Sequence, residues 1–180
     1  MSRLNGNDIF DAYFYSLVRI IDALYHDDDL NDSLYFIVSL ATELTGGKGS
    51  TIRVLEHGSF DLKAVTSYGL SKEYLDSGAI DFGKSITEII QGDIVIINDF
   101  ESDTRIQNLN AAYEEGLRSV IGIPFTVNDT TYSILRVYFS SRKIPTYDEI
   151  KLLKSLGKLS CLAIDRTVIN NMREREFGLA

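Results

Sequence analysis

Apolar residues near the N-terminus recur at the spacing of a helix. They alternate steps of four and three residues, a pattern typical of a helix that packs on a partner helix. The members of this stripe are Phe10, Phe14, Leu17, Ile21 and Leu24. The stripe is about two heptads long, which is short for a coiled coil. We therefore predict a helix over 8–25 and treat the stripe as a candidate dimer interface.

The chain then changes from a helical period to a strand period. One apolar face over 29–45 predicts a second helix, which the Gly46-Gly47 pair ends because glycine accepts the left-handed backbone conformation. Alternating patterns with turn residues between them predict two hairpins, over 51–69 and 119–140. The same glycines fall in the segment GGKGST, but a phosphate-binding loop would follow a strand and open a helix. We interpret the segment as a helix stop.

Further short elements lie between the two hairpins. Residues 93–99 are apolar at consecutive positions, which predicts a strand covered on both faces. Thr146 with Glu149 three residues later forms a capping box, which predicts a long last helix from Tyr147. Short helices are expected at 71–78, 86–92 and 107–115.

This order of elements predicts an α+β fold. Few strands are separated by helices long enough for a parallel crossover, so the sheet is expected to be antiparallel. Long helices would cover one face of the sheet and short helices the other. We expect an N-terminal helix at 1–27, one domain at 28–170, and a polar tail at 171–180 that frays.

Composition narrows the possible partners. The chain of 180 residues carries a formal net charge of −8, which argues against binding to duplex nucleic acid. It has no run of 18 apolar residues, and Asp8 and Asp11 fall where a signal peptide would need an apolar core. We therefore expect a cytoplasmic protein without a membrane span. One cysteine and two histidines leave little room for disulfides or metal chemistry, and no metal site is predicted.

The sequence resembles the GAF domains, a family of small-molecule-sensing modules. The resemblance is spread over about 30–168 rather than confined to one motif. The matching segments are GGKGSTIRVLE at 46–56, SYGLSKEYLDSG at 67–78, KSITEIIQGDIVIIND at 84–99, SDTRI at 102–106, AAYEEGLRSVIGIPF at 111–125, YSILRVYFS at 132–140 and YDEIKLLKSLG at 147–157.

The resemblance implies a PAS-related central antiparallel sheet with a ligand cavity. The long terminal helices would pack on one face and often form a dimer, and the short helices would roof the cavity on the other. Departures from the family pattern disfavour two of its ligand classes. The lysine of the cyclic-nucleotide pattern is missing between Asn98 and Arg118. The cysteine that bilin-binding relatives carry near the roof has no counterpart, because Cys161 falls in the last helix and is interpreted as a small core residue.

Two arginines interrupt apolar strands and are candidate ligand contacts. Arg53 and Arg136 would lie on neighbouring strands, where two cations repel unless a carboxylate or an anionic ligand lies between them. Asp99 is a candidate for that carboxylate, which would make the group a salt-bridge network. The alternative is recognition of a carboxylate or phosphate by the arginine fork.

The remaining candidates surround the expected cavity. Asp103 and Arg105 flank it, and an aspartate two residues before an arginine usually fixes a loop; ligand contact by Arg105 is the alternative. Tyrosine suits a pocket because it offers an apolar body and a polar tip, although it suits a core edge equally. The candidate tyrosines are Tyr68, Tyr74, Tyr113 and Tyr138.

Three functional hypotheses follow. The first is a cytoplasmic sensory domain that binds a small molecule, with an anion as one candidate, and signals through the terminal helices of a homodimer, to a separate output protein or within a larger polypeptide. The second is a dimerisation or scaffold module without a ligand. The third is an enzyme of the GAF-type free methionine sulfoxide reductase class, which is disfavoured because those enzymes relay oxidation through several cysteines. The sequence identifies neither a cofactor nor the ligand.

Overall fold

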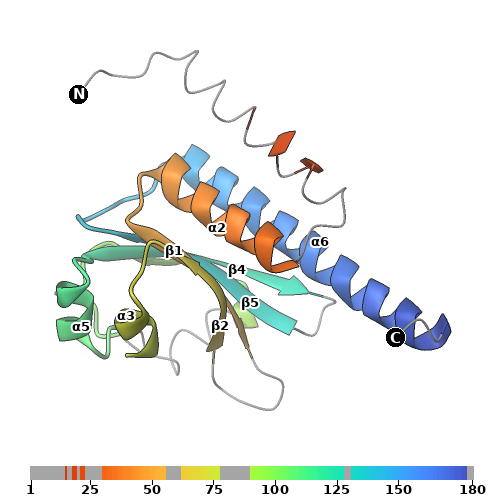
Figure 1. The fold of residues 1–180 in the computed structure, drawn as a ribbon. Coiled ribbons are helices and arrows are strands. Elements are labelled where there is room, and N and C mark those ends of the chain that lie inside the picture. Colours follow the sequence, from red (N-terminus) through yellow and green to blue (C-terminus); the bar gives the residue numbers. More distant parts are fainter. Residues whose placement is uncertain are drawn as a thin grey trace.

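The computed structural model describes residues 30–55, 62–77, 90–127 and 131–177, together with positions 15, 18, 19, 21 and 22. In this part of the chain five strands form one antiparallel sheet in the order β2-β1-β5-β4-β3 (Figure 1). The strands are β1 (Gly49–Leu55), β2 (Leu62–Tyr68), β3 (Val95–Ile97), β4 (Ser119–Val127) and β5 (Thr131–Phe139). The helices are α2 (Leu30–Thr45), α3 (Lys72–Asp76), α5 (Leu109–Glu114) and α6 (Tyr147–Phe177). The predicted α+β class and both hairpins are confirmed.

Helices of different length cover the two faces of the sheet. The long helices α2 and α6 lie side by side on one face, which we call the helix face (Figure 1). Their apolar residues pack with Ile52, Leu135 and Val137 in one core cluster. The short helices α3 and α5 lie on the other face, which we call the roof face, and contribute Tyr74 and Ala112 to a second cluster. Alternation along β1 and β5 sends neighbouring residues to opposite clusters.

The ends of the long helices follow the sequence signals. Gly46 adopts φ +69°, and the amide of Gly47 donates to the carbonyl of Thr42 at 2.8 Å, which closes α2. A side chain at Gly47 would collide with Val137, whose Cγ1 would lie 2.6 Å from the new Cβ. At the start of α6 the capping box forms as predicted: Thr146 N donates to Glu149 Oε2 at 2.7 Å, and Glu149 N donates to Thr146 Oγ1 at 3.2 Å.

Two predicted features differ from the structure. The strand at 93–99 was expected to be covered on both faces, but β3 is an edge strand of three residues. Val95 and Ile97 are buried, whereas Ile96 is 40% exposed. The last helix continues to Phe177, beyond the position at which a tail was expected to begin.

The predicted dimer stripe lies mostly outside the described residues. Phe10, Phe14, Leu17 and Leu24 belong to the part of the chain that the structure does not describe. Ile21 is described, and its side chain is 54% exposed. None of the described helices is long and apolar enough to cross a membrane.

Candidate functional site

Alternation along β1 and β5 places both candidate arginines on the roof face. Arg136 pairs across the strands with Thr51, and Arg53 pairs with Ile134, so the two arginines are diagonal neighbours. Both side chains are buried, with exposures of 8% for Arg53 and 3% for Arg136. The prediction that these residues lie on adjacent strands is confirmed.

The carboxylate expected between the arginines is not there. Asp99 instead pairs with Arg142, whose Nη2 lies 2.7 Å from Asp99 Oδ2. Arg53 Nη1 donates to the carbonyl of Leu62 at 3.2 Å, but Arg53 Nε and Arg136 Nη2 are buried without a hydrogen-bond partner among the described residues. The interpretation of the pair as a salt-bridge network with Asp99 is therefore wrong.

Two hydroxyl groups near the arginines share this lack of partners. The oxygens Thr51 Oγ1 and Tyr74 Oη are both buried, and neither has a hydrogen-bond partner among the described residues. Burial raises the pKa of Tyr74 far above its ordinary value, while the charges of Arg136 and Arg53 act in the opposite direction. The phenol therefore stays protonated. Guanidinium N–H groups can only donate and hydroxyls are able to donate, so the roof face holds an excess of donors.

Tyr74 also closes the middle of the roof face. Its ring meets the ring of Tyr138 edge to face, with centroids 5.7 Å apart and an interplanar angle of 86°. Both tyrosines are almost fully buried, at 4% and 1% exposed. These two predicted site residues do lie together, and they fill space with their own side chains.

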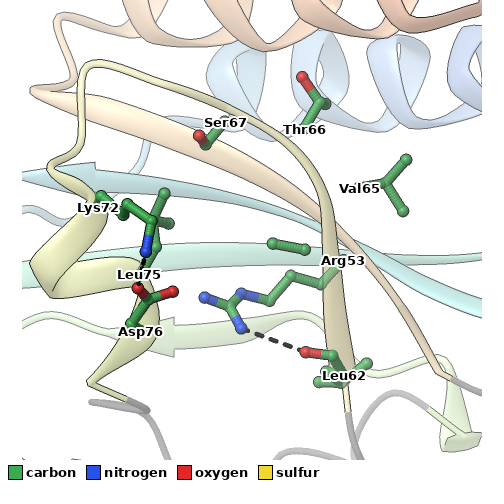
Figure 2. A pocket seen from close by; sticks show the side chains of 9 residues that line it. Arg53, Leu62, Val65, Thr66, Ser67, Lys72, Leu75 and Asp76 are labelled. Carbon is green, nitrogen blue, oxygen red and sulfur yellow. Dashed lines mark hydrogen bonds and ion pairs between the residues drawn. The ribbon is translucent and has the colours of Figure 1, made fainter.

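Open space lies beside this tyrosine pair, between β2 and α3. A cavity of about 440 Å³ has Arg53 on its lining, together with residues 62 and 64–67 from β2 and Lys72, Leu75 and Asp76 from α3. Figure 2 shows the guanidinium of Arg53 directed into the gap between the strand and the helix. Lys72 and Asp76 form an ion pair of 2.5 Å on the α3 side of this gap. Arg136 is not among the residues that line the cavity.

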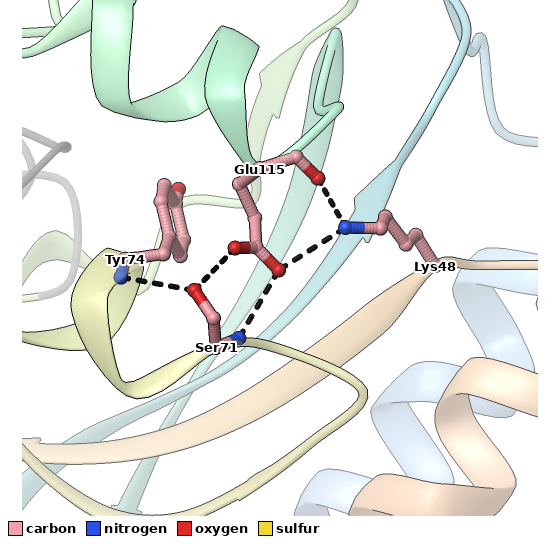
Figure 3. Close-up of polar contacts among 4 residues, drawn as sticks. All are labelled: Lys48, Ser71, Tyr74 and Glu115. Carbon is pink, nitrogen blue, oxygen red and sulfur yellow. Dashed lines mark hydrogen bonds and ion pairs between the residues drawn. The ribbon is translucent and has the colours of Figure 1, made fainter.

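A buried carboxylate holds α3 in place over the roof face. Glu115 Oε1 accepts hydrogen bonds at 3.1 Å from the amide of Ser71 and from Lys48 Nζ, and Glu115 Oε2 accepts from the Ser71 hydroxyl (Figure 3). The same hydroxyl accepts from the amide of Tyr74 at 3.1 Å and so caps α3. We call Lys48, Ser71 and Glu115 the roof clasp. It joins the start of β1, the start of α3 and the end of α5.

The clasp has a clear electrostatic signature. Burial tends to raise the pKa of Glu115, but the hydrogen bonds from Ser71 and Lys48 outweigh it, and the pKa lies below its ordinary value of 4.5. None of the clasp residues was a candidate from the sequence. Lys48 and Glu115 lie 67 positions apart, so no local sequence pattern indicates that they form an ion pair.

The other candidate residues lie away from the open space. Arg105 is held by Asp103 through bonds of 2.9 Å and 2.5 Å, and it also donates to the carbonyl of Ile96 at 3.2 Å, so it fixes a loop against β3. The Tyr68 hydroxyl instead meets Glu43 at 3.3 Å on the helix face. The guanidinium of Arg118 stacks on the ring of Tyr113, 4.1 Å from its centroid.

The single cysteine lies on the side of the sheet opposite the roof. Cys161 belongs to α6, and its Sγ is 3.5 Å from the carbonyl oxygen of Thr126. Burial raises the pKa of its thiol, with a smaller contribution from Asp165. Cys161 was predicted to be a small core residue, but it is only partly buried and belongs to neither core cluster. The raised pKa argues against a reactive thiol, since a reactive cysteine needs a lowered pKa.

The five-stranded sheet with long helices on one face and short helices on the other defines an α+β domain, and the sequence identifies the family. Residues 27–165 match the GAF domain family, so the chain belongs to that family. No curated protein matches the chain in sequence.

Solved structures with the same fold are distant in sequence. The GAF domain of the Acinetobacter phosphoenolpyruvate-protein phosphotransferase superposes with a TM-score of 0.66 at 18% identity, covering 88% of this chain and 96% of that one. The blue-light absorbing form of the Thermosynechococcus elongatus PixJ GAF domain gives a TM-score of 0.63 at 13% identity, covering 86% and 94%. A phycocyanobilin-bound GAF domain from a cyanobacterial phytochrome gives 0.66 at 13% identity, covering 94% and 98%. At these identities the similarity shows the fold alone.

Proposed function

We propose that this chain is a cytoplasmic sensory GAF domain that binds a small anionic molecule on the roof face and signals through its terminal helices in a homodimer. The observation that carries the proposal is the pair of buried arginines without a carboxylate. An arginine cannot lose its proton in a protein, so burial leaves the charge in place. The effective penalty for a buried ion is several kcal/mol, and an anion that accepts its hydrogen bonds offsets it.

The unpartnered groups match an anion rather than a cation or a neutral acceptor-rich ligand. Arg53, Arg136, Thr51 and Tyr74 present N–H or O–H groups that lack an acceptor among the described residues. A carboxylate or phosphate supplies several acceptor lone pairs at one point. The relatives support small-molecule binding by this fold, since one of them is described as phycocyanobilin-bound.

Strand β1 connects the proposed site with the helix face. Arg53 and Thr51 point to the roof, and the alternate residues Ser50 and Ile52 point to the helices. Ser50 Oγ donates to the carbonyl of Val38 at 2.6 Å, and Thr42 Oγ1 donates to Ser50 Oγ at 2.9 Å, so β1 is bonded to α2. A ligand that favours one position of β1 would bias α2 by population shift.

The N-terminal segment has features that suit a dimer contact. Arg19 lies over the ring of Phe36 in α2, 4.4 Å from its centroid. Tyr15, Val18 and Ile21 are exposed by 67%, 37% and 54%. A segment that meets α2 on one side and exposes apolar residues on another is suited to a second copy of the chain. The output of such a dimer would be a separate protein or another part of a larger polypeptide.

A ligand-free scaffold is the second candidate, and one observation favours it. Tyr74 and Tyr138 fill the centre of the roof face, as expected if the domain closes its own cavity. Catalysis is the least supported alternative, because Cys161 lies on the helix face with a raised pKa. We therefore propose a binding role and not an enzymatic one.

Native mass spectrometry of the protein as purified tests the proposal directly. A dimer with one discrete extra mass per subunit is expected, and that mass should be absent from the Arg53→Met variant. A dimer without extra mass whose melting temperature no anion raises would leave the scaffold as the function. Phe14→Asp combined with Leu17→Asp should convert the dimer to a monomer; an unchanged mass would show that the N-terminal stripe is not the interface.

A further inference from the structure

The cavity between β2 and α3 has properties that narrow the ligand class. We infer that it binds a small molecule with one carboxylate on an apolar body, and that Arg53 is the carboxylate contact. This inference rests on the proposed function and assigns its anion to one place on the roof face.

The orientation of Arg53 defines which of its edges is available. Nη1 is already used by the carbonyl of Leu62 at 3.2 Å, whereas Nε is buried without a partner. Nε has no solvent-accessible surface, so the end of the guanidinium that can reach the cavity is Nη2. The side chain is 8% exposed and points into the gap between β2 and α3 (Figure 2). A carboxylate in the cavity would therefore meet a charged donor that the bond to Leu62 has already oriented.

The charges around the cavity favour a monoanion over a phosphate. Arg53 contributes one positive charge, while Lys72 is neutralised by Asp76 at 2.5 Å. Asp76 also lines the cavity, so a second negative charge on the ligand would be repelled. Arg136 does not line the cavity and adds only longer-range attraction. The single charge of a carboxylate matches the one uncompensated positive charge of Arg53, whereas a phosphate dianion carries one negative charge too many.

The other residues that line the cavity indicate which chemical groups the ligand carries besides its carboxylate. Leu62, Ala64 and Leu75 line the cavity with apolar side chains, and Leu62 is 3% exposed. The volume of about 440 Å³ lies in the lower part of the range for small-molecule sites. Such a cavity suits a body of one ring or a short aliphatic chain. Ser67, which pairs with Thr51 of the roof face, adds a polar group for a further contact.

The test measures binding of benzoate, hexanoate, inorganic phosphate and neutral benzamide to the full chain by isothermal titration calorimetry and thermal shift. We expect benzoate or hexanoate to bind and benzamide to bind at least tenfold more weakly. Arg53→Met should weaken carboxylate binding about 10- to 100-fold, the effect of losing a charge-assisted hydrogen bond. Arg53→Lys should recover only part of the affinity because it keeps the charge without the fork.

Two further variants separate the cavity from the fold. Leu75→Phe fills the apolar wall without touching the charge, and should abolish hexanoate binding while the melting temperature stays close to that of the wild type. Lys154→Met is the matched control, because this exposed lysine lies on α6, across the sheet from the cavity; it should change carboxylate affinity less than threefold. If Arg53→Met folds poorly, Leu75→Phe still tests the inference, because hexanoate binding that survives in this variant would contradict it.

The possible failures are distinguishable. Phosphate binding that Arg53→Met removes, with no carboxylate bound, would overturn the carboxylate assignment and leave the proposed function standing. Carboxylate binding that depends on Arg136 but is unaffected by Arg53→Met and Leu75→Phe would move the site out of this cavity. A wild-type protein that binds none of the anions, with the roof-face donors intact, would overturn both the inference and the proposed function.

Discussion

Replacing Arg136 by methionine is expected to stabilise the ligand-free protein. Arg136 is 3% exposed, and its Nη2 has no hydrogen-bond partner among the described residues. Most substitutions of a core residue destabilise a protein. This one removes a buried charge and retains much of the side-chain volume, so the desolvation penalty disappears while the packing is largely kept.

The magnitude follows from the burial of the group. Replacing buried ionic side chains by apolar ones of similar size is neutral or stabilising by about 1–4 kcal/mol. Arg136 has no ionic partner to lose among the described residues, so we take about 2 kcal/mol as the expected gain. For a chain of this length, 1 kcal/mol shifts the melting temperature by about 2–4 °C. The variant should therefore melt about 4–8 °C higher than the wild type.

Chemical denaturation and calorimetry of ligand-free protein would measure this gain. Arg118→Met is the matched control, because the Arg118 guanidinium stacks on Tyr113 at 4.1 Å and donates to the carbonyl of Leu117 at 2.8 Å. That variant should lose about 0.5–1 kcal/mol. If Arg136→Met is instead destabilised by 2 kcal/mol or more, the guanidinium is satisfied in the free protein, and the argument for an anion site on the roof face fails.

Three other predictions concern the roof clasp, the glycines with positive φ and the cap of α6. Glu115→Ala should lower stability by about 2 kcal/mol at pH 7 through the loss of charge-assisted hydrogen bonds. Because the folded pKa of Glu115 is depressed, its contribution is complete above pH 4.5 and is lost as the pH falls below it, so wild-type and variant stabilities should converge in acid. Gly69→Ala should cost about 2–4 kcal/mol, because φ is +70° and the new Cβ would lie 2.4 Å from the Lys48 carbonyl oxygen; Gly92→Ala, at φ +76° with no atom within 4 Å, should cost only about 1–2 kcal/mol. Thr146→Ala should cost about 1 kcal/mol by thermal melting, and a larger loss would mean that more than the cap of α6 depends on this residue.

The elements with strong local signals were predictable from the sequence. Helix α2 ends at Thr45 because Gly46, which follows it, adopts the left-handed conformation, and a glycine at this point is visible in the sequence. The capping box before α6 depends on residues three positions apart, so it too is a local feature. The adjacency of Arg53 and Arg136 followed from the resemblance to the family, which orders the strands.

The face of the sheet on which a side chain lies was harder to predict where a strand is irregular. Arg53 pairs with Ala64 but Ile52 pairs with Thr66, so β2 contains one extra residue. Strict alternation would place Tyr68 on the same face as Ala64. The bulge reverses the alternation, and Tyr68 lies opposite Ser50 on the helix face. A single inserted residue thus removed one candidate from the roof, and no local pattern announced it.

Partner choice among distant charges was not predictable either. Asp99 was a candidate partner for the arginines, but Arg142 follows β5 in the chain and takes its carboxylate. The choice depends on where two loops meet at one edge of the sheet, and sequence spacing carries little information about it. The consequence is functional as well as structural. Because Asp99 is engaged elsewhere, neither arginine forms an ion pair with a carboxylate among the described residues.

The unpaired groups, more than the fold, indicate what this domain recognises. GAF relatives with the same architecture include a phycocyanobilin-bound domain, yet Cys161 lies across the sheet from the roof. A fold is compatible with many ligands, and specificity depends on the chemistry that it leaves unsatisfied. Here that chemistry is a set of donors: Arg53, Arg136, Thr51 and Tyr74. The roof clasp fixes α3, and therefore Tyr74, beside these donors, so an anion bound as we propose would meet groups that the fold positions before the ligand arrives.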